Sequence, residues 1–376
     1  PQPVENRFVV TVKPDVPAGV YAVRCIGKYG LSNARVFVVH AGESTLEVEP
    51  NNEIREANEI KLPAVLDGQF ATAADQDWYH FTGTAGQRLV IDAFSKRVDS
   101  RAELKMTLFS ADGRIVAESR PTLSGDSMIQ VSLPAAGEYG LRVGDALHGG
   151  GVDYSYRITI DSRPGVEFIF PPAGLPGSND EYTVYGFNLP GGQPSPLTVE
   201  GRPLEQLVTR IAIPGDIAGR IQYSGRLEAH QFALDGVEFR VNSPQGPSNP
   251  VLVTAAAGLV VREQADNNTP ATAQKLTPPC EVMGQFYPQR DTDWYTFDAK
   301  TGEVLWIEVI SQRLGVPTDP TLVIQRVSKN EMGMEQITPI ATVDDVDVRH
   351  GGREFDQRSY DPAYKFTAPA DGTYRI

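Results

Sequence analysis

Carboxylate and amide side chains near the start of the sequence have types and spacing that could hold a metal ion. A leading segment, EVEPNN at residues 47–52, is followed by DQDWYHF at residues 75–81. Ca²⁺ prefers about six to eight oxygen ligands from carboxylates, amides, backbone carbonyls and water. Alternate side chains of an extended segment share a face, so the acids within each segment should point the same way. The sequence therefore predicts a Ca²⁺ site formed by Glu47, Glu49, Asn51, Asn52, Asp75 and Asp77.

A second set repeats this pattern at an offset of 216 positions, because Asp75 and Asp77 recur as Asp291 and Asp293. One acid is missing. Ala265 stands where the first set has Glu49, and the neighbouring Asp266 should face the other way in an extended strand. We therefore expect a weaker Ca²⁺ site here, or an empty one. Its candidate ligands are Glu263, Asn267, Asn268, Asp291 and Asp293.

The same residues also have a structural interpretation, and the sequence alone leaves the two open. The asparagines can cap the helical segment EIREANEIK that follows them, and the aspartates can accept hydrogen bonds from turn amides. Tyr79 and Phe81 share the parity of the two aspartates and should enter a core. Because charges beside a core are costly unless compensated, we expect the aspartates at its rim, held by a cation or by hydrogen bonds.

Other residues that could bind a ligand are interpreted as structural. Trp78 and Trp294 have the opposite parity, so each could stack on a sugar or a peptide. Packing under a loop or against a neighbouring domain is the favoured interpretation. Asp344, Asp345 and Asp347 in DDVDVRHGG could hold a cation, yet the segment lacks the Gly and Glu of a calcium-loop pattern. We therefore expect a solvated loop there.

Motifs of known catalytic sites are absent from the sequence. None of the 5 His residues forms a His-Glu-x-x-His pair, and no Gly-x-Ser-x-Gly elbow, phosphate-binding loop or dinucleotide glycine pattern occurs. The two cysteines, Cys25 and Cys280, cannot make a disulfide scaffold and are interpreted as small buried hydrophobes. The sequence thus predicts a protein that is not an enzyme.

Charge and composition restrict the partners and the fold class. The formal net charge of −14 disfavours nucleic acid and anionic membrane surfaces, and no apolar run reaches membrane-spanning length. The 35 Gly and 29 Pro punctuate stretches in which Val, Ile, Thr, Tyr and Phe recur at alternate positions. This pattern predicts an all-β protein built of tandem β-sandwiches. The chain begins at Pro1 and not at Met, which we interpret as a processed or cut end.

The offset of 216 positions extends beyond the acidic sets and divides the chain into alternating modules. GLSN at residues 30–33 recurs as GPSN at residues 246–249, in both cases inside a predicted hairpin such as GVYAVRCIGKYGLSNARVFVV. We predict four modules, of which the first lacks its beginning and the last lacks its final strand. They span residues 1–42, 43–162, 163–257 and 258–376.

Two known families resemble these modules. Residues 43–162 resemble a bacterial pre-peptidase C-terminal domain through EVEPNNEIREANEI, DQDWYHFTGTAGQRLVI and LPAAGEYGLRV. Residues 258–376 resemble the same family through EQADNNTPATAQKL, RDTDWYTF and APADGTYRI. Residues 1–42 and 163–257 resemble immunoglobulin-like IPT/TIG domains through PGVEFIFPPAGLPGSNDEYTVYGFNL and SPQGPSNPVLV.

The resemblance implies jelly-roll-like β-sandwiches alternating with immunoglobulin-like ones in an exported bacterial protein, whether secreted, periplasmic or on the cell surface. Such modules accompany secreted peptidases and other large surface proteins without being the catalyst. Some relatives bind calcium where the leading segment meets the sandwich, and carrying that pattern over residue by residue gives the first acidic set. We therefore expect an accessory segment that spaces or stabilises neighbouring domains of the same polypeptide. The alternatives are a module that binds extracellular matrix protein or polysaccharide, and the accessory region of a secreted peptidase.

Overall fold

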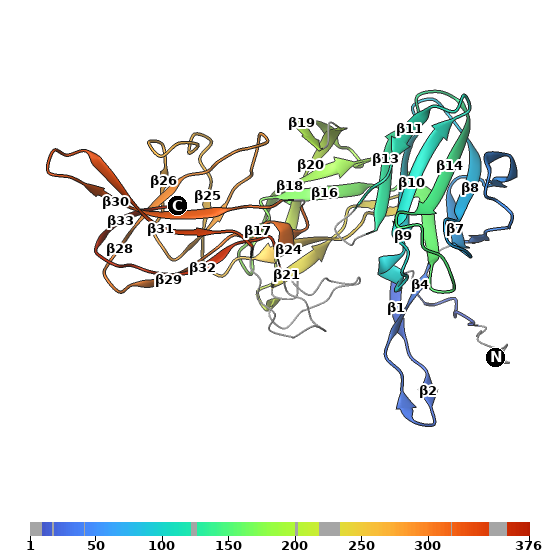
Figure 1. Cartoon of the computed structure of the whole chain (residues 1–376), viewed down its shortest axis with the longest axis horizontal. Coiled ribbons are helices and arrows are strands. Elements are labelled where there is room, and N and C mark those ends of the chain that lie inside the picture. The colour runs from blue at the N-terminus through green and yellow to red at the C-terminus, as the bar shows by residue number, and fades with distance from the viewer. Residues whose placement is uncertain are drawn as a thin grey trace. The chain divides into compact units, whose positions relative to one another are not determined.

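The computed structural model of the chain is an all-β structure (Figure 1). It describes residues 10–16, 19–40, 42–121, 126–199, 202–217, 234–316, 318–345 and 359–376. Within these ranges there is no α-helix, and helical structure is limited to short 3₁₀ turns. The predicted all-β class is therefore confirmed. Two compact units are distinguished, the first comprising Pro1–Arg163 and the second most of residues 164–376.

The first unit contains two large sheets that share one hydrophobic core. The six-stranded sheet is, in spatial order, β12 (Arg120–Pro121), β13 (Ser127–Ser132), β9 (Arg88–Phe94), β15 (Ser155–Asp161), β7 (Ala64–Gln69) and β5 (Thr45–Leu46). The five-stranded sheet is β11 (Ile115–Glu118), β10 (Leu104–Ser110), β14 (Gly137–Asp145), β8 (Gln76–Gly83) and β6 (Asn58–Glu59). Alternate side chains of both sheets are buried in a single cluster, because each strand turns one face inward.

A hairpin precedes these sheets in the first unit. Its arms are β1 (Gly19–Val23) and β4 (Arg35–Val39), and its tip is β2 (Ile26–Gly27) with β3 (Gly30–Leu31). Gly30 has φ +123°, a left-handed conformation that a side chain would strain, so the predicted turn before this glycine is confirmed. Cys25 lies exposed near the tip, so the expectation that both cysteines are buried is wrong for this residue. The hairpin end is exposed around it, so no core is available to bury the thiol.

The second unit begins with two sheets around a smaller core. One is β16 (Gly165–Phe170), β18 (Asn179–Phe187), β20 (Arg202–Ala212) and β19 (Gln193–Val199). The other is β17 (Ala173–Gly174), β24 (Val251–Ala255) and β21 (Gly236–Phe239), and the short pair β22 (Asn242–Ser243) and β23 (Gly246–Pro247) belongs to neither sheet. Buried Val184 and Val253 come from the two different sheets and belong to one cluster.

The remainder of the second unit contains three sheets around a third core. They are the pair β25 (Leu259–Arg262) and β27 (Cys280–Met283), the pair β29 (Val304–Glu308) and β32 (Ala363–Thr367), and a sheet of β26 (Gln274–Lys275), β28 (Tyr295–Ala299), β33 (Gly372–Arg375), β30 (Leu322–Lys329) and β31 (Glu335–Val343). Phe297, Phe366 and Tyr374 are fully buried where these sheets meet.

The internal repeat is visible in strand register as well as in sequence. Asn58 pairs with Tyr79 between parallel β6 and β8, and Gln274 pairs with Tyr295 between parallel β26 and β28, at the same offset of 216 positions. Side chains repeat too. The Asn58 amide exchanges two hydrogen bonds with the backbone of Val48, and Gln274 holds the second leading segment in the same way. The repeated sequence thus folds into repeated local structure.

One predicted element is much shorter than expected. The segment EIREANEIK forms only the 3₁₀ turn η1 (Ile54–Glu56) before β6 begins at Asn58. The residue at the N-cap of this turn is Glu53, and it makes no side-chain capping hydrogen bond. The idea that the asparagines cap a helix is therefore wrong, because the chain leaves the turn at once to pair with β8.

Candidate metal site

Acids from two separate segments come together at the edge of the first core. One carboxylate oxygen from each of Glu49, Asp75 and Asp77 lies within 4.8 Å of the other two. Glu49 belongs to the leading segment and is exposed, whereas Asp77 on β8 is 0% exposed and Asp75 is 8% exposed. Tyr79 and Phe81 continue the same face of β8 into the core. The predicted position of the aspartates at the rim is confirmed.

Glu47 is joined to Asp77 through a tyrosine of another sheet. The Tyr156 hydroxyl lies 3.0 Å from Glu47 Oε2, is hydrogen-bonded to Asp77 Oδ2, and lies 2.7 Å from the Tyr79 hydroxyl. Tyr156 has a single hydroxyl proton, so it can donate to only one of the two carboxylates. Only one of these two short contacts can therefore be a hydrogen bond that Tyr156 donates.

Backbone geometry makes room for this arrangement at Gly68. The Gln69 N–H donates to Glu47 Oε1 at 2.7 Å. A Cβ added at Gly68 would lie 2.4 Å from Glu47 Oε2 and 2.3 Å from the ring of Tyr156. These distances are shorter than any van der Waals contact, so only glycine lets the carboxylate and the ring meet above the strand.

The electrostatics of the set favour a bound proton when no cation is present. Burial is the main cause that raises the pKa of Asp77 from its ordinary value of 3.8 to about 8, and the negative charges of Glu47, Asp75 and Glu49 add to it. The Tyr156 hydrogen bond acts in the opposite direction. Burial also raises the pKa of Glu47. A cation among these oxygens would reverse the trend by stabilising the charged forms.

The oxygen set fits a hard divalent cation. Two oxygens that each bind Ca²⁺ at about 2.3–2.6 Å can be at most roughly 5 Å apart, which agrees with the spacing of the three carboxylates. All the donors are carboxylates, with no sulfur or imidazole, so the chemistry suits Ca²⁺ better than zinc. Asp75 also accepts the N–H of Ala71 at 2.7 Å through Oδ2, which confirms the predicted turn-amide contact.

The two asparagines of the leading segment have different surroundings. Asn51 is fully buried, its N–H donates to Glu49 Oε2 at 3.0 Å, and its carbonyl accepts the N–H of Trp78 at 2.9 Å. It therefore fastens the leading segment beside β8. Asn52 is exposed.

The second acidic set has the same plan with one acid fewer. The carboxylate oxygens of Glu263, Asp291 and Asp293 lie within 4.8 Å of one another, and all three residues are half-buried. Glu263 Oε2 accepts the Gln285 N–H at 2.8 Å, as Glu47 accepts that of Gln69. Burial first, then the hydrogen bond from Glu263, raises the pKa of Asp293 to about 7.

The remaining members of the second set lie around this trio. Asn267 is buried, and its carbonyl accepts the Trp294 N–H at 2.8 Å, matching the contact of Asn51 in the first set. Asn268 and Asp266 are exposed, and Asp266 does not belong to the converging carboxylates. Asp266 therefore does not replace the acid that Ala265 lacks, in agreement with the parity argument.

The tryptophans that follow the aspartates pack against their own modules. Trp78 is half-buried with its ring 5.3 Å from that of Phe109, and Arg142 lies over it at 5.9 Å. Ile54 of η1 is close by, because both it and Trp78 would touch a Cβ at Gly140. Trp294 is half-buried under Arg375, which lies 6.0 Å from its ring. The prediction that Trp78 packs under a loop is confirmed.

A third group of acids was only partly foreseen. Asp344 and Asp345 are exposed and converge with Asp319, which comes from a different loop and was missed. Asp347 lies outside the described residues. Thr321 donates a hydrogen bond of 3.0 Å to Asp344. The exposure of all three acids agrees with a solvated loop.

Sequence reasoning also missed a buried ion-pair cluster that occurs twice. Arg97, on the 3₁₀ turn η2 (Lys96–Val98), donates to Asp126 and to Asp92 at 2.6 Å each. Arg313, on η5 (Gln312–Leu314), donates likewise to Asp361 at 2.9 Å and to Glu308 at 2.7 Å. The repeated triplets SKR and SQR were the available signal. In each copy one arginine bridges two carboxylates, which holds β9 and β29 to distant loops and has a structural role.

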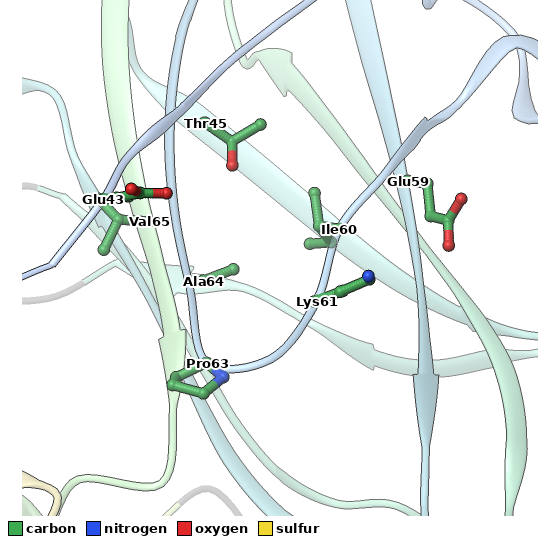
Figure 2. A pocket seen from close by; sticks show the side chains of 8 residues that line it. All are labelled: Glu43, Thr45, Glu59, Ile60, Lys61, Pro63, Ala64 and Val65. Atoms are coloured by element: carbon green, nitrogen blue, oxygen red, sulfur yellow. The ribbon is translucent and has the colours of Figure 1, made fainter.

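An open pocket of about 440 Å³ lies beside the strands β5 and β7 of the first unit, as Figure 2 shows. It shares no residue with the acidic set. The lining side chains come from the start of β5 and the chain just before it, from the end of β6, from the turn that joins β6 to β7, and from the start of β7. They are Glu43, Thr45, Glu59, Ile60, Lys61, Pro63, Ala64 and Val65. Two acids, one lysine, one threonine and aliphatic groups form a mixed lining.

Comparison with known proteins gives only distant structural similarity. No protein-family model matches the chain, and no curated protein matches it. The chain is similar to the pre-peptidase C-terminal domain of a collagenase from Bacillus anthracis, with 17% identity over 31% of this chain and 100% of that one and a TM-score of 0.25. It is also similar to PliG, a periplasmic inhibitor of g-type lysozyme, from Aeromonas hydrophila and Salmonella Typhimurium. Both show 21% identity over 28% of this chain and 96% of theirs, with TM-scores of 0.23 and 0.21. At these scores the similarities establish neither a family nor a function.

A membrane-spanning helix is not found among the residues that the structure describes.

Proposed function

We propose that this chain is a non-catalytic accessory segment of an exported bacterial protein, and that calcium stiffens its modules. In this proposal, jelly-roll-like sandwiches of the pre-peptidase C-terminal type alternate with immunoglobulin-like IPT/TIG sandwiches. They space or stabilise a neighbouring catalytic or adhesive region of the same polypeptide, which is secreted, periplasmic or on the cell surface. The carrying observation is the convergence of Glu49, Asp75 and Asp77 within 4.8 Å at the edge of a core.

A cation at this place would connect two parts of the chain. Glu47 and Glu49 belong to the leading segment, which follows the hairpin β1–β4, whereas Asp75 and Asp77 begin β8 inside the large sheets. Binding both groups to one ion would fix the direction in which the chain enters the sandwich. It would also offset the repulsion among carboxylates that are held together in a site poor in water.

Calorimetric titration of the metal-stripped chain with Ca²⁺ tests the proposal. We expect binding coupled to proton release near neutral pH, because a cation must displace the proton that Asp77 holds with a pKa of about 8. Titrations in two buffers of different ionisation enthalpy measure that release, and Mg²⁺ serves as the control ion because it demands a smaller octahedral site. Absence of heat, with an unchanged melting temperature at millimolar calcium, would remove calcium from the proposal.

The mechanical role has a separate test. Small-angle X-ray scattering with and without chelator reports whether calcium alters the arrangement of the modules. We expect a smaller spread of conformations with calcium, and an unchanged radius of gyration and flexibility would contradict a stiffening role. The accessory region of a secreted peptidase is one form of this proposal.

A binding module for extracellular matrix protein or polysaccharide is the second candidate function. Tyr29 at the tip of the first hairpin is 95% exposed, beside exposed Ile26 and Leu31. Exposed aromatic and aliphatic groups at a loop tip are a common means of contacting a partner. Binding of the chain to immobilised collagen or to a glycan array, reduced by Tyr29→Ser, would favour this candidate.

A further inference from the structure

The hairpin β30–β31 of the second unit (Figure 1) has two exposed methionines at its tip. The chain contains 5 Met. Met106, Met128 and Met283 are at most 8% exposed, whereas Met332 is 78% exposed and Met334 is 54% exposed. Methionine is among the residues most often buried in proteins. The tip therefore presents two thioether side chains to solvent, separated in sequence by a single glycine.

Hydrogen bonds define the backbone of the turn that carries both methionines. The Asn330 N–H donates to the Met334 carbonyl and the Gly333 N–H donates to the Asn330 carbonyl, at 2.9 Å each. The Asn330 side-chain Oδ1 accepts the N–H of Met332 at 3.0 Å and that of Met334 at 2.9 Å. Gly333 has φ +76°, a left-handed conformation that favours glycine. The turn is thus held in one shape although its side chains are exposed.

The hairpin β10–β11 of the first unit contains the same turn with different side chains. The Ser110 N–H donates to the Arg114 carbonyl at 2.9 Å, the Gly113 N–H donates to the Ser110 carbonyl at 2.8 Å, and Gly113 has φ +78°. Counted from the glycine, Asp112 and Arg114 occupy the positions of the two methionines. They meet, because Arg114 Nε lies 3.1 Å from Asp112 Oδ2. A turn of this geometry therefore lets side chains at these two positions converge on one point.

The change from an ion pair to two thioethers changes what this turn can bind. Asp112 and Arg114 neutralise each other, whereas a thioether is uncharged, polarisable and a soft ligand. Soft thioethers select Cu(I), while Ca²⁺ and Mg²⁺ prefer oxygen ligands. Exposed Glu331 adds negative charge at the tip, and Glu335 is already paired with Arg375 through two contacts of 2.9 Å. The tip thus combines two soft ligands with a charge that attracts a cation.

From these observations we propose that Met332 and Met334 bind one Cu(I) ion through their two sulfur atoms. With only two protein ligands on an exposed tip, the ion is accessible to further soft ligands, which suits transient binding and exchange. Binding at this tip does not depend on calcium or on the accessory function proposed above, because it uses neither acidic set. It can fail or succeed independently of them.

Methyl NMR tests the site directly, because methionine labelled with ¹³C at its methyl group gives one signal per residue. Ag⁺ in chloride-free buffer is the probe, since it prefers sulfur as Cu(I) does and is stable in air. Cys25 and Cys280 are replaced in every protein by Cys25→Ser and Cys280→Ala, because thiolates bind the same ions. We expect one equivalent of Ag⁺ to shift the signals of Met332 and Met334, while the three buried methionines serve as unshifted references.

Two matched double variants give the decisive comparison, with Cu(I) uptake measured by competition against bicinchoninate. Met332→Leu with Met334→Leu keeps the apolar side chains and removes both sulfurs, so it should lose the equivalent of Cu(I) that the unmodified hairpin binds. Asp112→Met with Arg114→Met transfers the pair to the matching turn of the first unit and should add one equivalent. Equal uptake by the unmodified and Leu-substituted hairpins, or no added equivalent after the transfer, would overturn the proposal.

Discussion

The substitution Asp77→Asn separates the proton-binding and cation-binding behaviour of the first acidic set. The folded protein holds the Asp77 proton more tightly than the unfolded chain, because burial raises its pKa from 3.8 to about 8. This contribution to stability is complete below the unfolded pKa. It declines as the pH rises, and it is lost once the pH passes the folded pKa near 8.

The size of the effect follows from the shift. Each pKa unit corresponds to about 1.4 kcal/mol. Ionisation of buried Asp77 alone should therefore lower the free energy of unfolding of the metal-free protein by at most about 5 kcal/mol between pH 4 and pH 8. Asparagine keeps the shape of the protonated acid and cannot ionise. In chelator at pH 8 we therefore expect Asp77→Asn to be more stable than the unmodified chain, and the two to be similar near pH 4. Calcium should stabilise only the unmodified chain.

Urea unfolding read by pulsed hydrogen exchange measures this locally. Peptides that cover β8 (Gln76–Gly83) report the first unit, and those that cover β28 (Tyr295–Ala299) act as an internal reference in the same sample. The comparison is made from pH 4 to pH 8.5, in chelator and in calcium. The reasoning is refuted if the metal-free unmodified chain has the same stability across this range, or if Asp77→Asn is the less stable protein at pH 8.

Three further substitutions test the packing around this set and the buried ion pairs. Asp126→Ala leaves a buried arginine without its partner and should destabilise the first unit by about 3–5 kcal/mol in urea unfolding, whereas exposed Asp112→Ala should change little. Gly68→Ala introduces a contact of 2.3 Å, so it should lower stability by about 1–3 kcal/mol and also weaken calcium binding. Gly144→Ala is the control, because its nearest atoms lie at 3.7 Å, and calorimetry should show that it is tolerated. Tyr156→Phe removes a hydroxyl that contacts two carboxylates and should cost about 1–3 kcal/mol, and a neutral thermal-melting result would contradict the importance given to that hydroxyl.

Strand parity and the internal repeat could be predicted from the sequence because both are properties of a short stretch of chain. The alternation in DQDWYHF was sufficient to place Asp77 on the inward side with Tyr79, and the structure buries both. The offset of 216 positions likewise predicted that the second leading segment would resemble the first, and the strand registers repeat at that offset. The length of η1 was overestimated, because pairing of Asn58 with β8 outweighs the local helical pattern.

The sequence by itself therefore determined the all-β class, the repeat and the clustering of acids at the start of β8, since these depend on pleat and spacing alone. Only the tertiary structure decided which distant groups complete the set. Tyr156 lies 79 positions after Asp77 and on the other sheet, and it meets the aspartate only because the two sheets close on one core. Arg97 and Asp126, 29 positions apart, meet because β9 and β13 are neighbours in one sheet. Contacts between sheets depend on the topology of the whole module, which no local pattern encodes.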